Sequence, residues 1–244
     1  WIAAGDVTPA GVRIDSLHRA ADLPGGAREF APALEALVAH VATLADHIVG
    51  FDFPFSLPAE LIDQASWRSF VRSFATEFDT PERFRDRCRA ITGGRELKRK
   101  CDTEARVPWC AYNLRLYRQT WSGIRHVLHP LVAENRARVI PMQTEQPGKP
   151  TIAEICPASL LKHEDLYKPY KGSGATLRAS RETILRSVTR RKMLLPIRGN
   201  LRRTILDNPG GDALDAVLSA LAVARIETPL PRDKYDRIES RVYF

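Results

Sequence analysis

Four carboxylates stand in segments whose other residues are mostly apolar. Asp52 follows the run "HIVGF", Glu154 interrupts "TIAEICPASLL", and Asp212 and Asp215 open "GDALDAVLSALAVA". Burying a carboxylate is costly unless it is paired, hydrogen-bonded or bound to a metal. If the four side chains converge, their hard oxygen atoms suit Mg²⁺ or Mn²⁺. We therefore take all four as candidate catalytic residues and candidate metal ligands.

Each acid also has a purely structural explanation. Asp52 could cap the turn that follows its strand. Glu154 could pair with one of the many arginines, and Asp212 would suit the positive end of a helix dipole. The structural explanation is weakest for Asp215, which lies one turn deeper on a helix otherwise suited to burial.

An acidic metal site on a basic protein would suit phosphodiester hydrolysis. The chain has 37 Lys and Arg against 29 Asp and Glu, a net charge of +8. Two cations about 3.5–4 Å apart can activate a water and stabilise the leaving oxygen, while basic residues hold the phosphates. The candidate nucleic-acid-binding residues, in "YKPYKGSG" and in the basic run 178–203, are Lys168, Lys171, Arg190 and Arg191. A solvated basic face is the alternative for both segments.

The elements that would position these residues alternate between strands and helices. Apolar or alternating runs predict strands over residues 1–5, 11–20, 45–53, 137–142 and 151–155. Helical spacing recurs over 28–44, 178–194 and 211–226, and residues 59–135 are mainly helical in pattern. This order predicts one α/β domain over residues 1–244, with a helical insertion at about 59–135. Asp52 would then end a buried strand, where ligands bind in open α/β sheets.

Cysteine usage and hydropathy narrow the class of protein. The cysteines, which form no C-x-x-C pair, are Cys88, Cys101, Cys110 and Cys156. We therefore expect reduced thiols, no zinc site and a cytoplasmic protein. No apolar run approaches the ~20 residues that a membrane span needs.

Three stretches resemble the DUF429 family of predicted nucleases in the RNase H-like superfamily. They are "GFDFPFSLPAELI", "IAEICPASLL" and "GDALDAVLSALAVA". The last is also similar to the final helix of RuvC-type Holliday-junction resolvases. The resemblance implies an RNase H-like fold, a mixed five-stranded sheet of order 3-2-1-4-5 flanked by helices. It also implies metal-ligand roles for the same four acids.

The chain departs from that family at three places. The family's first strand carries a Gly-x-Asp that has no counterpart before "WIAAG", so either that strand lies outside these residues or the site is incomplete. The family's closing Glu-Gly-Trp is "ESR" here, which keeps the acid as Glu239, and the Thr of its Arg-x-Thr-Asp stretch is Cys101. These departures bear on activity more than on fold.

The sequence thus predicts a nuclease or phosphodiesterase that depends on Mg²⁺ or Mn²⁺ and acts on nucleic acid, DNA or RNA. The alternative is an RNase H-like module that binds nucleic acid or protein without cutting, which the missing first-strand Asp favours. A nucleotide-binding phosphotransferase is a third possibility, supported only by "KGSG". We also expect residues 1–5 to pair with the strand in 11–20.

Overall fold

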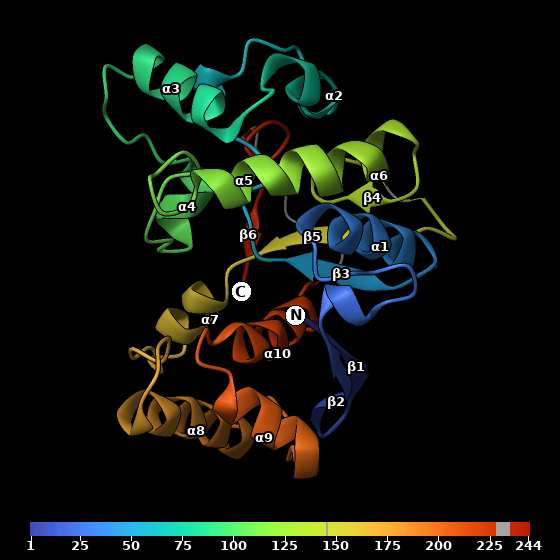
Figure 1. Ribbon diagram of the computed structural model, residues 1–244, viewed down its shortest axis with the longest axis vertical. Helices are drawn as coiled ribbons and strands as arrows, with labels where there is room; N and C mark the ends of the chain where they lie inside the picture. Colours follow the sequence, from blue (N-terminus) through green and yellow to red (C-terminus); the bar gives the residue numbers. More distant parts are fainter. Residues whose placement is uncertain (145, 228–234) are drawn as a thin grey trace.

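The computed structural model describes residues 1–144, 146–227 and 235–244. They form a mixed α/β structure with two separate sheets (Figure 1). The first is the antiparallel hairpin of β1 (Ile2–Thr8) and β2 (Gly11–His18). In the second sheet β5 (Thr151–Ile155) pairs with β3 (Ile48–Phe51), β4 (Arg138–Val139) and β6 (Val242–Tyr243), always in parallel.

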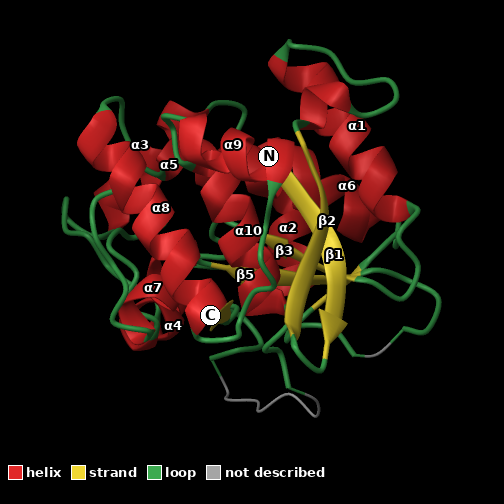
Figure 2. Ribbon diagram, turned by 90° about the horizontal axis from the view of Figure 1, so that it is seen from below, coloured by secondary structure: helices red, strands yellow, loops and turns green. Residues whose placement is uncertain are grey.

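The expected pairing of the first residues is confirmed, because Ile2 lies opposite His18 and Gly5 opposite Ile14. The expected single mixed sheet of five strands is not formed by the described residues. The hairpin stands apart from β3 and β5 (Figure 2) and is joined outside itself by a bridge between Val12 and Leu194. The four-stranded sheet is entirely parallel, which agrees with the apolar run that forms β3.

The helices cover both faces of the parallel sheet. On one side lie α1 (Phe30–Ala42) and the segment between β3 and β4, in which α5 (Tyr117–Gly123) continues through a π-helical turn (Ile124–Leu128) into α6 (His129–Ala133). The other helices of that segment are α2 (Trp67–Glu77), α3 (Pro81–Ile91) and α4 (Lys100–Glu104). The mainly helical pattern predicted for residues 59–135 is thus confirmed. The hydroxyls of Ser66 and Thr80 cap α2 and α3.

On the other side of the sheet, α10 (Asp212–Val223) packs against β3, β5 and the hairpin. Beyond it lie α7 (Pro157–His163), α8 (Ala175–Arg190) and α9 (Gly199–Asp207). The sequence pattern predicted α8 but neither α7 nor α9. Gly50 permits the close approach of α10, because a Cβ there would lie 2.6 Å from the Val223 side chain. In the described residues, no helix has the length and apolarity needed to cross a membrane.

The parallel sheet separates two apolar cores, and successive β5 residues point into different ones. Ile152 belongs to the core with α2, α5 and α6. Ala153 and Ile155 belong to the core with α8, α9 and α10. The side chain of Glu154 therefore leaves β5 on the face turned away from α10. This alternation decides which partner Glu154 meets.

Candidate active site

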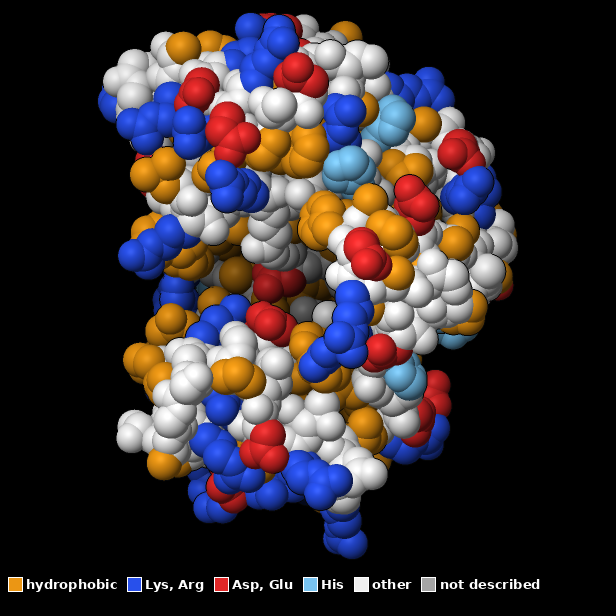
Figure 3. Space-filling view, in the orientation of Figure 1, with side chains coloured by type: hydrophobic (Ala, Val, Ile, Leu, Met, Phe, Trp, Pro, Cys, Tyr) orange, Lys and Arg blue, Asp and Glu red, His pale blue; other side chains and the backbone are white. Residues whose placement is uncertain are grey.

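A cavity of about 420 Å³ opens at the C-terminal ends of β3 and β5. Its floor contains Asp52, Glu154 and Cys156, one wall is the loop between α4 and α5, and the other is the loop between α7 and α8. Figure 3 shows the hollow crossing one face of the molecule, with acidic side chains inside it and Lys and Arg side chains along its rim. Parallel α/β sheets bind ligands at this end of their strands.

Asp52 reaches the cavity because the backbone that follows it is held on several sides. The Gln119 amide donates to the carbonyl of Asp52. The Phe55 N–H donates to Glu154 Oε2 over 2.9 Å, and the Trp67 indole N–H donates to the Phe55 carbonyl, also over 2.9 Å. These bonds fix the turn after β3, which Pro54 prevents from continuing as a paired strand.

The Asp52 carboxyl itself has no hydrogen-bond or ion-pair partner among the described residues. It is open to the cavity, yet protein atoms surround it closely. Burial and the neighbouring charge of Asp215 raise the pKa of Asp52 to about 7, and Glu154 and Asp212 add to the rise while Lys171 opposes it. The ionised form of Asp52 is therefore disfavoured until a cation approaches.

Glu154 is not available in the same way. Its two oxygens accept from Arg99 Nη1 and Nη2 over 2.8 and 2.5 Å, and one of them also accepts from Phe55 N–H. Arg99 is bonded in turn to Asp102 over 2.6 Å, and its side chain is wholly buried. The pairing with an arginine that the sequence left open for Glu154 is what the structure shows. The cause is the strand alternation, which turns Glu154 toward Arg99, next to α4.

Asp215 also lines the cavity, close enough to Asp52 for its charge to raise the pKa of that carboxyl. The Tyr170 hydroxyl donates to Asp215 Oδ1 over 2.5 Å, and Lys171 Nζ lies 2.6 Å from Oδ2. Burial raises the pKa of Asp215 and Lys171 opposes the rise. Gly211, with φ of 77°, allows this approach, because a Cβ there would lie 3.0 Å from side-chain atoms of both Tyr170 and Lys171.

Asp212 is exposed and does not line the cavity, although its charge contributes to the raised pKa of Asp52 and of Asp215. It does not cap α10 either, because the side chain of Asn208 accepts from the Ala213 N–H in the first turn. The structure thus brings Asp52, Glu154 and Asp215 to one cavity and leaves Asp212 beside it.

The four basic candidates have different surroundings. Lys171 lines the cavity and contacts Asp215. Arg191 is tied to Glu164 over 2.7 Å. Arg190 is exposed on α8 and forms no ion pair with any described residue. Lys168 is partly buried in the loop between α7 and α8. Only Lys171 of the four belongs to the cavity lining.

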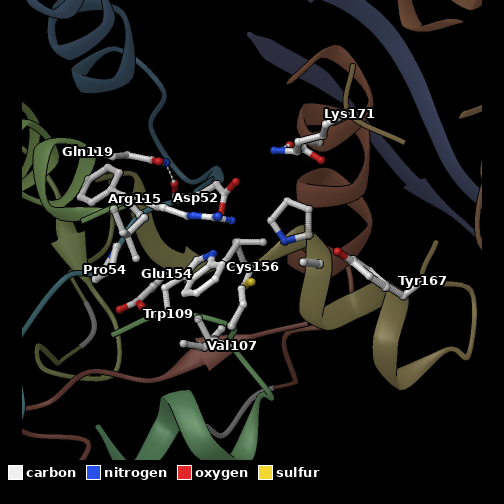
Figure 4. A pocket seen from close by; sticks show the side chains of 18 of the residues that line it. Asp52, Pro54, Val107, Trp109, Arg115, Gln119, Glu154, Cys156, Tyr167 and Lys171 are labelled. Atoms are coloured by element: carbon white, nitrogen blue, oxygen red, sulfur yellow. Dashed lines mark hydrogen bonds and ion pairs between the residues drawn. The ribbon is translucent and has the colours of Figure 1, made fainter. Parts of the chain in front are cut away.

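The sequence analysis missed three large side chains of the cavity. Trp109 and Arg115 come from the loop between α4 and α5, and Tyr167 comes from the opposite wall (Figure 4). The alternation of Tyr and Lys in "YKPYKGSG" was a usable signal for Tyr167, whereas nothing local singled out Trp109. Cys156 also lines the cavity, but burial raises the pKa of its thiol to about 11, so it is no nucleophile at neutral pH.

The donor set limits what cation the cavity could hold. Among the described residues, no group of three or more His, Cys, Asp or Glu side chains is arranged to bind a metal ion. Asp52 and Asp215 both line the cavity and neither is paired with an arginine, although Lys171 contacts Asp215. No protein-family model, no curated protein and no solved structure matches this chain.

Proposed function

We propose that this protein is a divalent-metal-dependent phosphodiesterase acting on nucleic acid, with an RNase H-like arrangement of its parallel strands and final helix. The observation that carries the proposal is the Asp52 carboxyl, which lines the same cavity as Asp215, lies within reach of its charge and has no partner in the described part of the chain. Asp52 is exposed at the cavity, and a cation there would stabilise its ionised form, which the neighbouring protein atoms and Asp215 disfavour.

The two aspartates fit Mg²⁺ better than a site built wholly from protein. Mg²⁺ retains several waters and is usually held by one or two carboxylates together with substrate phosphates. Asp52 and Asp215 supply two carboxylates, and Asp212 adds negative charge close by. Glu154 is left out of this ligand set because Arg99 occupies both of its oxygens.

Lys171 would have to leave Asp215 when the cation binds. Its side chain is 55 % exposed, so it can move into solvent or onto a substrate phosphate at little cost. Tyr170 would keep its hydrogen bond to the other oxygen of Asp215 and so hold the carboxylate in place. Burial raises the pKa of the Tyr170 hydroxyl, which therefore remains a donor at every physiological pH.

A bound divalent cation would polarise a water and a phosphoryl oxygen. The side chains of the cavity would bind the cation and the substrate. Asp52 faces the cavity and must lose its proton to bind a cation, so cation affinity should fall as the pH drops below about 7. Lys171 and Arg115 provide positive charge for the substrate backbone on opposite walls.

A second candidate is a module that binds nucleic acid without cutting it. The Lys171–Asp215 ion pair favours this alternative, because an internal ammonium group already occupies a position that a cation would take. The two candidates differ in one respect that can be measured, which is whether a divalent cation binds at Asp52 and Asp215.

The test combines cation binding with cleavage. Mn²⁺ or Mg²⁺ should raise the melting temperature and support cleavage of labelled DNA or RNA by the unsubstituted protein. Asp52→Asn and Asp215→Asn should each abolish both effects and leave the fold intact. Asp165→Asn, an exposed aspartate outside the cavity lining, is the matched control and should change neither.

Lys171→Met separates the two candidates further. If Lys171 competes with the cation for Asp215, this variant should bind Mn²⁺ more tightly than the unsubstituted protein. Nucleic-acid binding without any cation-dependent melting shift or cleavage would favour the non-cutting module.

A further inference from the structure

The walls of the cavity are richer in aromatic rings than contact with a phosphate backbone requires. Trp109 is half-buried on one wall, and the other wall contains Tyr167, which is 52 % exposed, and the buried Tyr170. In Figure 4 the hydroxyl end of Tyr167 points toward the cavity from the side opposite Trp109. Aromatic rings on two sides of a cavity suit a planar aromatic ligand.

A cationic side chain lies over an aromatic ring on each of these walls. The guanidinium of Arg115 lies over the Trp109 ring, 4.8 Å from its centroid, and Lys162 Nζ lies 5.5 Å from the centroid of Tyr167. The Arg115 guanidinium forms no ion pair with any residue that the structure describes. Figure 4 shows the Arg115 side chain extending over the Trp109 ring toward Asp52. A cation stacked on an aromatic ring and open to solvent is one of the two parts of a single-strand binding surface.

The size of the cavity agrees with one nucleotide rather than a duplex. Its volume of about 420 Å³ falls within the range of roughly 300–1,000 Å³ found for small-molecule sites. In a duplex the bases are stacked and paired, so none can enter a walled cavity unless it is flipped out or unpaired. A phosphate attached to a base held by Trp109 would lie on the Asp52 side, beside Arg115.

We infer that the cavity is a nucleobase-binding subsite and that the substrate class is single-stranded nucleic acid, or an unpaired nucleotide at an end or a bulge. This inference rests on the proposed function for the chemistry that follows binding. Trp109 and Tyr167 would stack on the base, and Arg115 would contact the adjoining phosphate. Stacking of the base would then add affinity to that supplied by the ionic contacts of the phosphates.

The experiment measures binding alone, in EDTA, so that it does not depend on cleavage. Fluorescence anisotropy compares three probes of equal charge, which are a labelled oligothymidylate, the same strand with abasic spacers, and a hairpin duplex. Stacking contributes roughly 1–3 kcal/mol per base, so the abasic strand and the duplex should each bind about 10-fold more weakly than the oligothymidylate.

Substitutions show which side chains contact the base and which contact the phosphate. Trp109→Ala and Tyr167→Ala should each reduce the preference for the base-containing strand and leave abasic binding almost unchanged, and Trp109→Phe should retain most of that preference. Arg115→Ala should weaken binding of every probe. The matched controls are Phe30→Ala, an exposed aromatic residue outside the cavity lining, and Arg118→Ala, an arginine that pairs with Glu82.

The outcomes are distinguishable from those of the proposed function. Equal binding of the base-containing and abasic strands would overturn the inference, even if the protein cleaves duplex with Mg²⁺. A base preference that depends on Trp109, without any Mg²⁺-dependent cleavage, would uphold the inference and contradict the proposed function. Thermal melts of each variant in the same buffer establish that it is folded.

Discussion

Replacing Asp52 by Asn should stabilise the cation-free protein, and the gain should grow with pH. The pKa of Asp52 rises from 3.8 to about 7 in the folded state, chiefly through burial and then through Asp215. Between these two values the unfolded chain has released the proton and the folded chain has not. Stability that Asp52 contributes at low pH is therefore lost as the pH rises from about 4 to about 7.

The expected change in the free energy of unfolding follows from the change in the pKa of Asp52. Three pH units correspond to about 4 kcal/mol at about 1.36 kcal/mol per unit. Because the carboxyl is open to the cavity, solvent screening reduces the expected gain to about 1–2 kcal/mol at pH 8. Near pH 4 the variant and the unsubstituted protein should differ little.

Urea denaturation in EDTA at several pH values between 4 and 8 measures this difference directly. Asp165→Asn is the control, and its effect should not depend on pH. A difference between Asp52→Asn and the unsubstituted protein that is the same at pH 4.5 and pH 8 would refute the argument, as would a loss of stability at pH 8.

Three further predictions concern the residues around the site. Arg99→Met should cost about 3–5 kcal/mol in urea denaturation, because it leaves Glu154 and Asp102 buried without their partner, whereas Arg118→Met, which breaks an exposed pair, should cost less than about 1 kcal/mol. Gly211→Ala should destabilise the protein by about 1–3 kcal/mol, and by more than Gly25→Ala, because both glycines have φ of 77° but only Gly211 is crowded, by Tyr170 and Lys171. Reversing Arg190 and Arg191 to Glu together should weaken binding to all nucleic-acid sequences alike and lower its salt dependence. Unchanged binding in a salt titration would leave that part of α8 as a solvated face.

Most elements around the site could be predicted because their patterns are local. The all-apolar run before Asp52 predicted a buried strand, and β3 forms there, but its four residues are exposed or only partly buried. The alternation in 11–20 predicted a strand that pairs with the first residues, and the hairpin confirms it. The spacing of apolar residues predicted the buried helix that contains Asp215. In each case neighbouring residues carry the signal.

The arrangement of those elements and the partners of the acids could not be predicted. Which arginine meets Glu154 depends on the face of β5 from which it leaves and on the distant placement of Arg99, 55 residues away. The contact of Lys171 with Asp215 joins the loop after α7 to the first turn of α10, and α8 and α9 lie between them in the sequence. Trp109 reaches the cavity through tertiary packing alone. The separation of the β1–β2 hairpin from the parallel sheet likewise leaves no mark in the strand patterns.

The most direct test of the central claim is a crystal of the protein soaked in Mn²⁺, with the anomalous difference density measured for the unsubstituted chain and for Asp52→Asn. The proposal predicts a peak between the carboxylates of Asp52 and Asp215, with Lys171 displaced from Asp215, and no peak in the variant. Density without any such peak, with Lys171 still bound to Asp215, would contradict it.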